Sequence, residues 1–159
     1  MPVIEIALDV RAPIDRVFDL SRSVEVHAHS TARTRERPVA GVMSGLLTLH
    51  DRVTWEATHF GVRQRLTSEI VEFTRPTHFR DAMVSGAFRR FDHDHEFAVT
   101  DAGTHAVDRF DFNSPLGPLG AIADALVLTR YMRTFLEIRL EVIKSIAESD
   151  AWMKYLYPS

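Results

Sequence analysis

Two histidines alternate with acidic residues in the stretch FDHDHEF, which covers residues 91–97. Imidazole nitrogens and carboxylate oxygens are metal ligands, and they also form acid/base pairs or the polar wall of a binding site. Side chains two residues apart in a β-strand point to the same face, so His93 and His95 share one face and the three acids share the other. The chemistry of this stretch therefore depends on which face is buried.

The neighbouring strands decide which face of this stretch is buried. Pairing the predicted strands Phe88–Val99 and His105–Asn113 across the turn at Ala102-Gly103 places mainly apolar residues on the face that carries the histidines. A face dominated by apolar side chains points towards the core. We therefore predict that His93 and His95 are inward and that the acids beside them face solvent.

Two aspartates are predicted to lie close to the inward histidines. Asp81 is expected to point inward from the preceding strand, His78–Val84, near His93, and Asp108 is expected to lie diagonal to His95. Because histidines beside aspartates can carry protons, these four residues are the candidate catalytic residues of an enzyme. Buried, neutral and hydrogen-bonded histidines are the structural alternative. Two histidines and a carboxylate can also hold a metal ion, but no third ligand has a diagnostic spacing, so we expect no metal and no cofactor.

An arginine lies on the apolar side of the predicted final helix, Ala121–Glu148. At about 100° per residue, Arg139 is surrounded by Met132, Phe135, Val142 and Ile146. A guanidinium stays charged, so a buried position requires a carboxylate, ordered water or an anionic ligand. Two interpretations follow: a structural ion network with Asp81 or Asp108, or a cavity in which these groups meet a ligand.

The elements that position these residues come in a simple order. Val3–Val10 alternates as a half-buried strand does, and two short helices are predicted over Ile14–Leu20 and Val24–His29. From Arg33 onward, alternating runs joined by short connections with glycine are typical of an antiparallel meander. The predicted strands are Arg33–Ala40, Arg52–Phe60, Val62–Phe73, His78–Val84, Phe88–Val99 and His105–Asn113.

The charges of one hairpin support its register. Pairing His59 with Val62 brings Glu56 opposite Arg65, and opposite charges across a strand pair are stabilising. The other face of this hairpin, which carries Trp55, is then the inward one.

Composition limits the class of protein. The chain has 159 residues, of which 45% are hydrophobic, so we expect a single domain over residues 1–159. It has no cysteine, which excludes thiolate catalysis, cysteine-based zinc sites and disulfides. The net charge of −3 gives no reason to expect nucleic acid, and no segment is apolar enough for membrane insertion. Because the start of the sequence lacks the layout of a signal peptide, a cytoplasmic location is expected.

The whole chain resembles a known superfamily. The segments IEIALDVRAPIDRVFDLSRSVEVH, VTWEATHFG, FRDAMVSGAFRRFDHDHEF and DFNSPLGPLG are similar to the SRPBCC superfamily, in particular to bacterial stand-alone members of unassigned role. This superfamily groups START lipid-transfer domains, birch-pollen-allergen-like proteins and polyketide cyclase/dehydrases. The resemblance implies an α+β helix-grip fold: a curved seven-stranded antiparallel sheet wrapped around a long C-terminal helix, with two short helices after the first strand. It implies a hydrophobic tunnel between sheet and helix, but no particular reaction.

We therefore expect a protein that binds, and so transports or sequesters, a small hydrophobic molecule with a polar or anionic group. The alternatives are a polyketide cyclase/dehydratase-like enzyme that uses the inward histidines and aspartates as acid and base, and a protein-interaction module with a closed cavity. The aromatic tail AWMKYLYPS either covers a neighbouring surface or forms a homodimer contact. The expected ligand-binding residues are Trp55, His59, Gln64, Leu66, Asp81, Met83, Phe91, His93, His95, Phe97, Asp108, Phe110, Phe112, Leu116, Met132, Phe135 and Arg139.

Overall fold

A computed structural model describes residues 2–114 and 117–159. Seven strands form one antiparallel sheet in the order β1-β7-β6-β5-β4-β3-β2, so that β2 to β7 are a meander and β1 pairs with the last strand. The strands are β1 (Val3–Val10), β2 (Arg37–Gly41), β3 (Arg52–His59), β4 (Val62–Thr74), β5 (His78–Ser85), β6 (Arg90–Thr100) and β7 (Gly103–Asn113).

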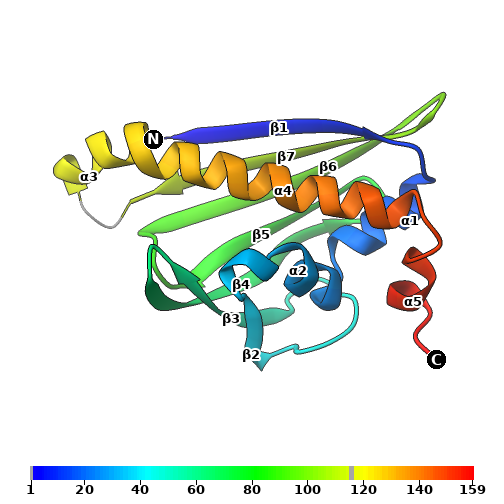
Figure 1. Ribbon diagram of the computed structural model, residues 1–159, viewed down its shortest axis with the longest axis horizontal. Coiled ribbons are helices and arrows are strands. Elements are labelled where there is room, and N and C mark those ends of the chain that lie inside the picture. The colour runs from blue at the N-terminus through cyan, green and yellow to red at the C-terminus, as the bar shows by residue number, and fades with distance from the viewer. Residues whose placement is uncertain (1, 115–116) are drawn as a thin grey trace.

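The helices gather on one face of this sheet. Figure 1 shows the long helix α4 lying along the sheet, with α1 and α2 beside it, and both short helices contact it. The helical elements are α1 (Ile14–Ser21), α2 (Val24–Ser30), a 3-10 turn η1 (Ala32–Thr34), α3 (Gly117–Ala123), a π-helical turn η2 (Asp124–Leu128), α4 (Thr129–Ala147) and α5 (Trp152–Leu156). The seven-stranded antiparallel sheet, the long C-terminal helix and the two short helices after β1 confirm the predicted fold class.

Local sequence explains the two short helices. Pro13 precedes α1, where its fixed φ suits the entry into a helix, and Asp15 follows in the first turn. Ser23 caps α2, because its hydroxyl accepts a hydrogen bond from the Val26 amide. These helices place Phe18 and Val26 in the core.

An aromatic cluster of the core lies beneath α1. Phe18 meets Phe73, Phe79 and Phe97 edge to face, with ring centroids 5.4–5.5 Å apart. Such contacts add to the free energy of burial. Aromatic rings therefore fill the core beneath α1, and the cavity described below begins beside them at Phe79.

The predicted strand registers around the histidines are confirmed. Glu56 pairs with Arg65 between β3 and β4, and Asp81 pairs with His93 between β5 and β6. Asp108 lies directly opposite His95 in the β6–β7 pair, so the predicted diagonal placement, two residues away on the same face, was wrong. Both histidines are buried, as predicted from the apolar face of β6.

Most predicted boundaries agree with the structure to within two residues, but one strand and the final helix differ by more. The predicted strand Arg33–Ala40 begins only at Arg37, because the 3-10 turn η1 and a left-handed Arg35 occupy its first residues. The predicted helix Ala121–Glu148 is interrupted by the π-helical turn at Asp124–Leu128. A π-helical turn is built from the same residue types as the α-helix around it, so the sequence pattern predicts one continuous helix.

None of the helices within the described residues is long and apolar enough to cross a membrane.

Candidate functional site

A cavity of about 530 Å³ lies between the sheet and the helices. Strands β3 to β7 supply one side of its wall, and α1, α2 and α4 supply the other. Small-molecule sites in proteins have this size and are mostly apolar. The apolar part of this wall includes Trp55, Leu66, Phe91, Phe110, Met132 and Phe135.

Charged side chains gather at one place in this wall. Asp81, His93, His95 and Arg139 line the cavity, and Asp108 lies behind the histidines. Both histidines and Arg139 are buried, whereas the side chain of Asp81 is 20% exposed. We call these five residues the polar cluster.

His95 lies between two carboxylates. Its Nδ1 is 2.9 Å from Asp108 Oδ1, and its Nε2 is 3.0 Å from Asp81 Oδ1. Carboxylates only accept hydrogen bonds, so both contacts require an imidazolium that donates from both nitrogens. Burial lowers the pKa of His95, but the charge of Asp108 and the two hydrogen bonds outweigh burial and raise this pKa above its ordinary value.

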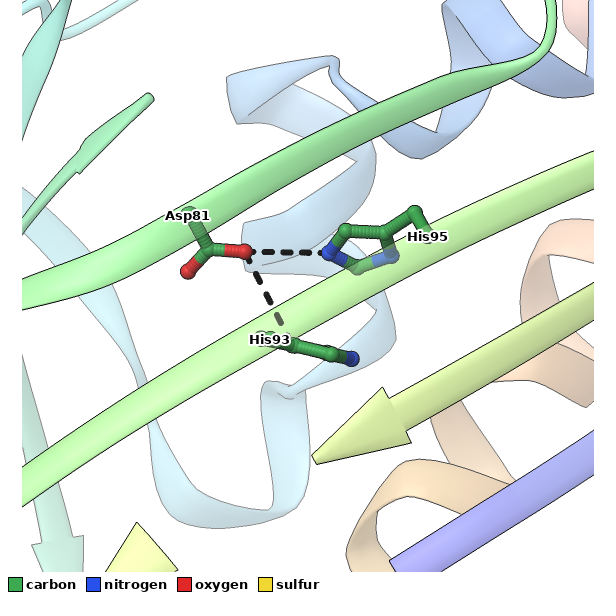
Figure 2. A group of neighbouring side chains, drawn as sticks. All are labelled: Asp81, His93 and His95. Atoms are coloured by element: carbon green, nitrogen blue, oxygen red, sulfur yellow. Dashed lines mark hydrogen bonds and ion pairs between the residues drawn. The ribbon is translucent and has the colours of Figure 1, made fainter. Parts of the chain in front are cut away.

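His93 has looser contacts. Its Nδ1 lies 3.7 Å from Asp81 Oδ1 and its Nε2 lies 3.6 Å from Asp108 Oδ2, both beyond hydrogen-bond distance. Within the described residues, Nε2 is buried and has no hydrogen-bond partner. Burial and the nearby charge of His95 lower the pKa of His93, which favours a neutral ring. Figure 2 shows both histidines reaching the same oxygen of Asp81.

The two aspartates are held in their charged form. Burial alone would raise the pKa of Asp108, but the charge of His95 and the hydrogen bond from it hold this pKa well below its ordinary value. Burial would likewise raise the pKa of Asp81, but the hydrogen bond from His95 outweighs burial and lowers this pKa. Two carboxylates, one imidazolium and one guanidinium therefore balance in charge.

Arg139 lies within the apolar face of α4 and makes polar contacts with two other elements, β7 and α1. Its Nη1 lies 3.3 Å from Asp108 Oδ2, and its Nη2 donates to the Ser21 carbonyl oxygen at 2.9 Å. The structure thus provides the buried ion network that was one of the two interpretations of Arg139. Its Nε is buried without a partner among the residues that the structure describes.

A second polar pair lies near the start of α4. His59 Nδ1 and the Tyr131 hydroxyl are 2.7 Å apart, and both residues line the cavity. Burial lowers the pKa of His59 and raises that of Tyr131, so both are neutral at pH 7. Tyr131 precedes Arg139 by eight residues, or about 12 Å along the helix axis. The cavity therefore has polar groups at two separate places.

Most of the residues expected from the sequence to bind a ligand lie in this wall. Four of the described ones lie elsewhere: Phe97 and Phe112 are in the buried core, Met83 packs beside it, and Asp108 is screened by the histidines. Leu116 lies outside the described residues. The expected residues that line the cavity are Trp55, His59, Gln64, Leu66, Asp81, Phe91, His93, His95, Phe110, Met132, Phe135 and Arg139.

Sequence reasoning missed several residues of the wall, of which Tyr131 is the most informative. Tyr131, Phe135 and Arg139 are spaced four apart, so they form one stripe on α4. This spacing was a usable signal. Phe88 and Ser21 also line the cavity, but they lie in a loop and at a helix end, where no periodicity indicates a direction.

The aromatic C-terminal tail covers a surface of its own chain, which is the first of the two roles expected for it. Trp152 stacks under the Arg16 guanidinium at 4.1 Å, and Tyr155 packs against the core beneath α1. The homodimer contact stays a prediction.

No protein-family model and no curated protein matches this chain. Solved structures do match it. The protein TTHA0849 from Thermus thermophilus is 19% identical, with a TM-score of 0.74 over 91% of this chain and 95% of that one. Major latex-like protein 151 from Panax ginseng is 13% identical, with a TM-score of 0.66 over 93% and 98% of the two chains. Ara h 8.0201 is 11% identical, with a TM-score of 0.62 over 91% and 98%.

These similarities are structural. At such low identity they show the fold, and they agree with the helix-grip architecture predicted from the order of elements. The neighbours have the fold that the resemblance to the SRPBCC superfamily implies. One fold can carry unrelated functions, so the function has to be inferred from the cavity itself.

Proposed function

We propose that this protein binds a small, largely hydrophobic molecule that carries a polar group. The observation that carries this proposal is the cavity of about 530 Å³, whose apolar wall ends in the polar cluster. An apolar pocket with a few convergent polar groups is the usual form of a small-molecule site. Such a space favours ligand binding over a protein-interaction module with a closed cavity.

The charges favour a particular kind of polar group. Asp108 already pairs with the positive charge of Arg139, and the Ser21 carbonyl accepts a second hydrogen bond from it, so an anionic ligand would meet a guanidinium whose charge is already balanced. Asp81 is the most exposed member of the polar cluster, and its carboxylate can accept hydrogen bonds from a ligand. Of the polar and anionic groups expected from the sequence, a hydrogen-bond donor such as a hydroxyl or amine therefore fits better than an anion.

Two experiments test this proposal. Native mass spectrometry of protein purified from its own host should reveal a retained small molecule. Fluorescence titration should show that aminoanthracene binds more tightly than anthracene carboxylate, which has the same ring system and the opposite polar character. Absence of a retained molecule together with no binding of either probe would rule out a ligand site, whereas preference for the carboxylate would assign the polar end to an anion.

A proton-transfer enzyme is the second candidate function. The observation that favours it is the position of His95 between Asp81 and Asp108 at the cavity wall, where a bound carbonyl compound would meet acid and base groups together. Conversion of a polyketide-like substrate should then be lost in both His93→Ala and His95→Ala while circular dichroism shows folded protein. Turnover that survives both substitutions excludes this role.

A further inference from the structure

We propose that Asp81, His93 and His95 form a binding site for a divalent transition-metal ion at the polar end of the cavity. Metal binding goes beyond the proposed function and needs no organic ligand, so the two proposals can fail separately.

The ligand atoms converge on one point. Nε2 of His95 and Nδ1 of His93 lie 3.0 Å and 3.7 Å from the same Asp81 oxygen (Figure 2). Nitrogen and oxygen ligands that each lie about 2.1 Å from a zinc ion are about 3.0–3.5 Å from one another in tetrahedral or octahedral geometry. One atom from each of the three residues lies within 4.8 Å of the others, and His93 has to move towards the other two ligands to complete the set.

The far side of both histidines faces a single carboxylate. Asp108 Oδ1 is 2.9 Å from His95 Nδ1, and Asp108 Oδ2 is 3.6 Å from His93 Nε2. Metal-bound histidines usually donate their second N–H to a carboxylate or carbonyl, which orients the ring and increases its basicity. Asp108 is in the position to do this for both rings, and Arg139 in turn holds Asp108 at 3.3 Å.

His93 supplies an independent reason to expect a ligand. The residue is only 7% exposed, yet Nε2 has no hydrogen-bond partner among the described residues, and Nδ1 approaches Asp81 no closer than 3.7 Å. A buried polar group without a partner is costly. A metal ion on Nδ1 would fill the gap between this ring and Asp81 and leave the proton on Nε2, which faces Asp108.

The scaffold suits such a site. His93 and His95 lie two apart on β6, and Asp81 is paired directly with His93 across the β5–β6 ladder, so hydrogen-bonded strands hold all three. Because the three residues line the cavity, coordination positions remain open towards a bound molecule or water. Two histidines and one carboxylate suit Zn²⁺, Co²⁺ or Fe²⁺ better than Mg²⁺ or Ca²⁺, which prefer oxygen ligands.

Metal binding and one hydrogen bond of the metal-free protein exclude each other. The proton between His95 Nε2 and Asp81 Oδ1 occupies the place that the ion would take. The ion replaces this proton, while the hydrogen bond from His95 Nδ1 to Asp108 is kept.

Cobalt titration tests the site. Protein freed of metal with a chelator is titrated with Co²⁺ and followed by visible absorption, and Zn²⁺ is then added as competitor. We expect one equivalent of Co²⁺ to bind, Zn²⁺ to displace it, and His93→Ala to weaken binding by about 100-fold or more, because even loss of an outer-shell partner costs about 10–100-fold.

The matched control is His78→Ala. His78 also lies on this sheet beside acidic residues, at 2.8 Å from Asp94, but it does not line the cavity. Its loss should leave Co²⁺ affinity unchanged within about twofold. Equal weakening in both variants, or wild-type binding that displays no defined stoichiometry, would overturn the proposal.

A second measurement does not depend on any variant being folded. Zinc-edge X-ray absorption of the zinc-loaded wild-type protein should show scattering from two imidazole rings. A spectrum without imidazole scattering would contradict the site.

Discussion

At the scale of single residues, Arg139 shows how a buried charge on a helix is paired with a carboxylate on the sheet. Helical periodicity alone placed this guanidinium within an apolar face, and burial of the residue confirms that placement. The choice between Asp81 and Asp108 depended on the strand order, which brings β7 beside β6 and turns Asp108 towards α4. The charge is therefore paired by the sheet and not by its own helix.

Replacing Arg139 with methionine should destabilise the protein. The apolar side chain has a similar length, but Asp108 would lose a cationic partner while staying buried. Breaking a buried ion pair in this way costs about 3–5 kcal/mol. Urea denaturation followed by circular dichroism measures the change.

The control for this prediction is Arg130→Met on the exposed side of α4. We expect it to change the free energy of unfolding by no more than about 0.5 kcal/mol. Equal stability of Arg139→Met and wild type would mean that the ion network contributes nothing to folding.

At the scale of elements, one close approach between backbone segments determines which residue can begin β7. Gly103 begins β7 and lies against the end of β1. A Cβ atom there would overlap the Val10 carbonyl oxygen and come within 2.8 Å of the Ala12 amide nitrogen. This position requires glycine for space as well as for its φ of +150°.

Gly103→Ala should therefore destabilise the protein much more than Gly61→Ala. The first change forces backbone segments apart and should cost about 2 kcal/mol or more. Gly61, in the β3–β4 turn, has a φ of +75° but open space around its Cα, so only the backbone strain of about 1 kcal/mol is expected. Thermal denaturation of both variants compares them, and a larger loss for Gly61→Ala would refute the role of close approach.

A second contact between elements depends on pH. Asp19 on α1 accepts hydrogen bonds from Arg22 at 2.8 Å and from Arg75, in the β4–β5 connection, at 2.8 Å and 3.1 Å. Burial raises the pKa of Asp19, but these two arginines outweigh burial and lower this pKa below its ordinary value. The stabilisation is therefore fully present above the unfolded pKa, near 4, and is lost as pH falls through the lower folded pKa.

Asp19→Asn should reduce stability by about 1 kcal/mol at pH 7, since solvent screens part of this interaction. The difference between wild type and variant should shrink as the pH is lowered below about 4. Urea denaturation at pH 7 and at pH 3 measures it. A difference that stays constant across this range would show that the charge of Asp19 does not stabilise the fold.

At the scale of the whole molecule, the inner face of the sheet divides into a packed end and a hollow end. Aromatic side chains fill the space beneath α1, whereas the cavity lies next to it under α4. Both regions are lined by apolar residues of the same strands. The two regions differ in how much of the space between sheet and helices is filled by side chains: the rings fill it beneath α1, and the side chains under α4 leave part of it empty.

A larger side chain at Ala57 should close part of this cavity. Ala57 is buried on β3 and lines the cavity wall, so Ala57→Leu places additional carbon atoms in the empty space. We expect aminoanthracene affinity to fall about tenfold, while stability changes by less than about 1 kcal/mol. Fluorescence titration and thermal denaturation measure the two effects.

The matched substitution is Ala98→Leu, at an exposed position of β6 away from this cavity. It should leave probe affinity unchanged. Loss of affinity in both variants, or in neither, would show that the probe binds elsewhere.

Much of the architecture follows from local patterns in the sequence. Alternation assigned the faces of β6, charge pairing indicated the β3–β4 register, and both are confirmed. The boundaries at η1 and η2 did not follow, because neither a left-handed residue nor a single π-helical turn has a hydrophobic period of its own. The wall residues in loops, such as Phe88, were missed for the same reason: no period links a loop residue to a direction.

By itself, the sequence determined which side chains point inward, since side-chain direction follows from the two-residue and 3.6-residue repeats of strands and helices. It thereby brought His93, His95 and Arg139 to the inner side of the protein. Only the tertiary structure decided which of the inward residues face a cavity and which are core, as the different environments of Phe91 and Phe97 show. It also decided that both histidines reach one oxygen of Asp81. These outcomes depend on distances between elements, and those distances are set by how all the side chains pack together.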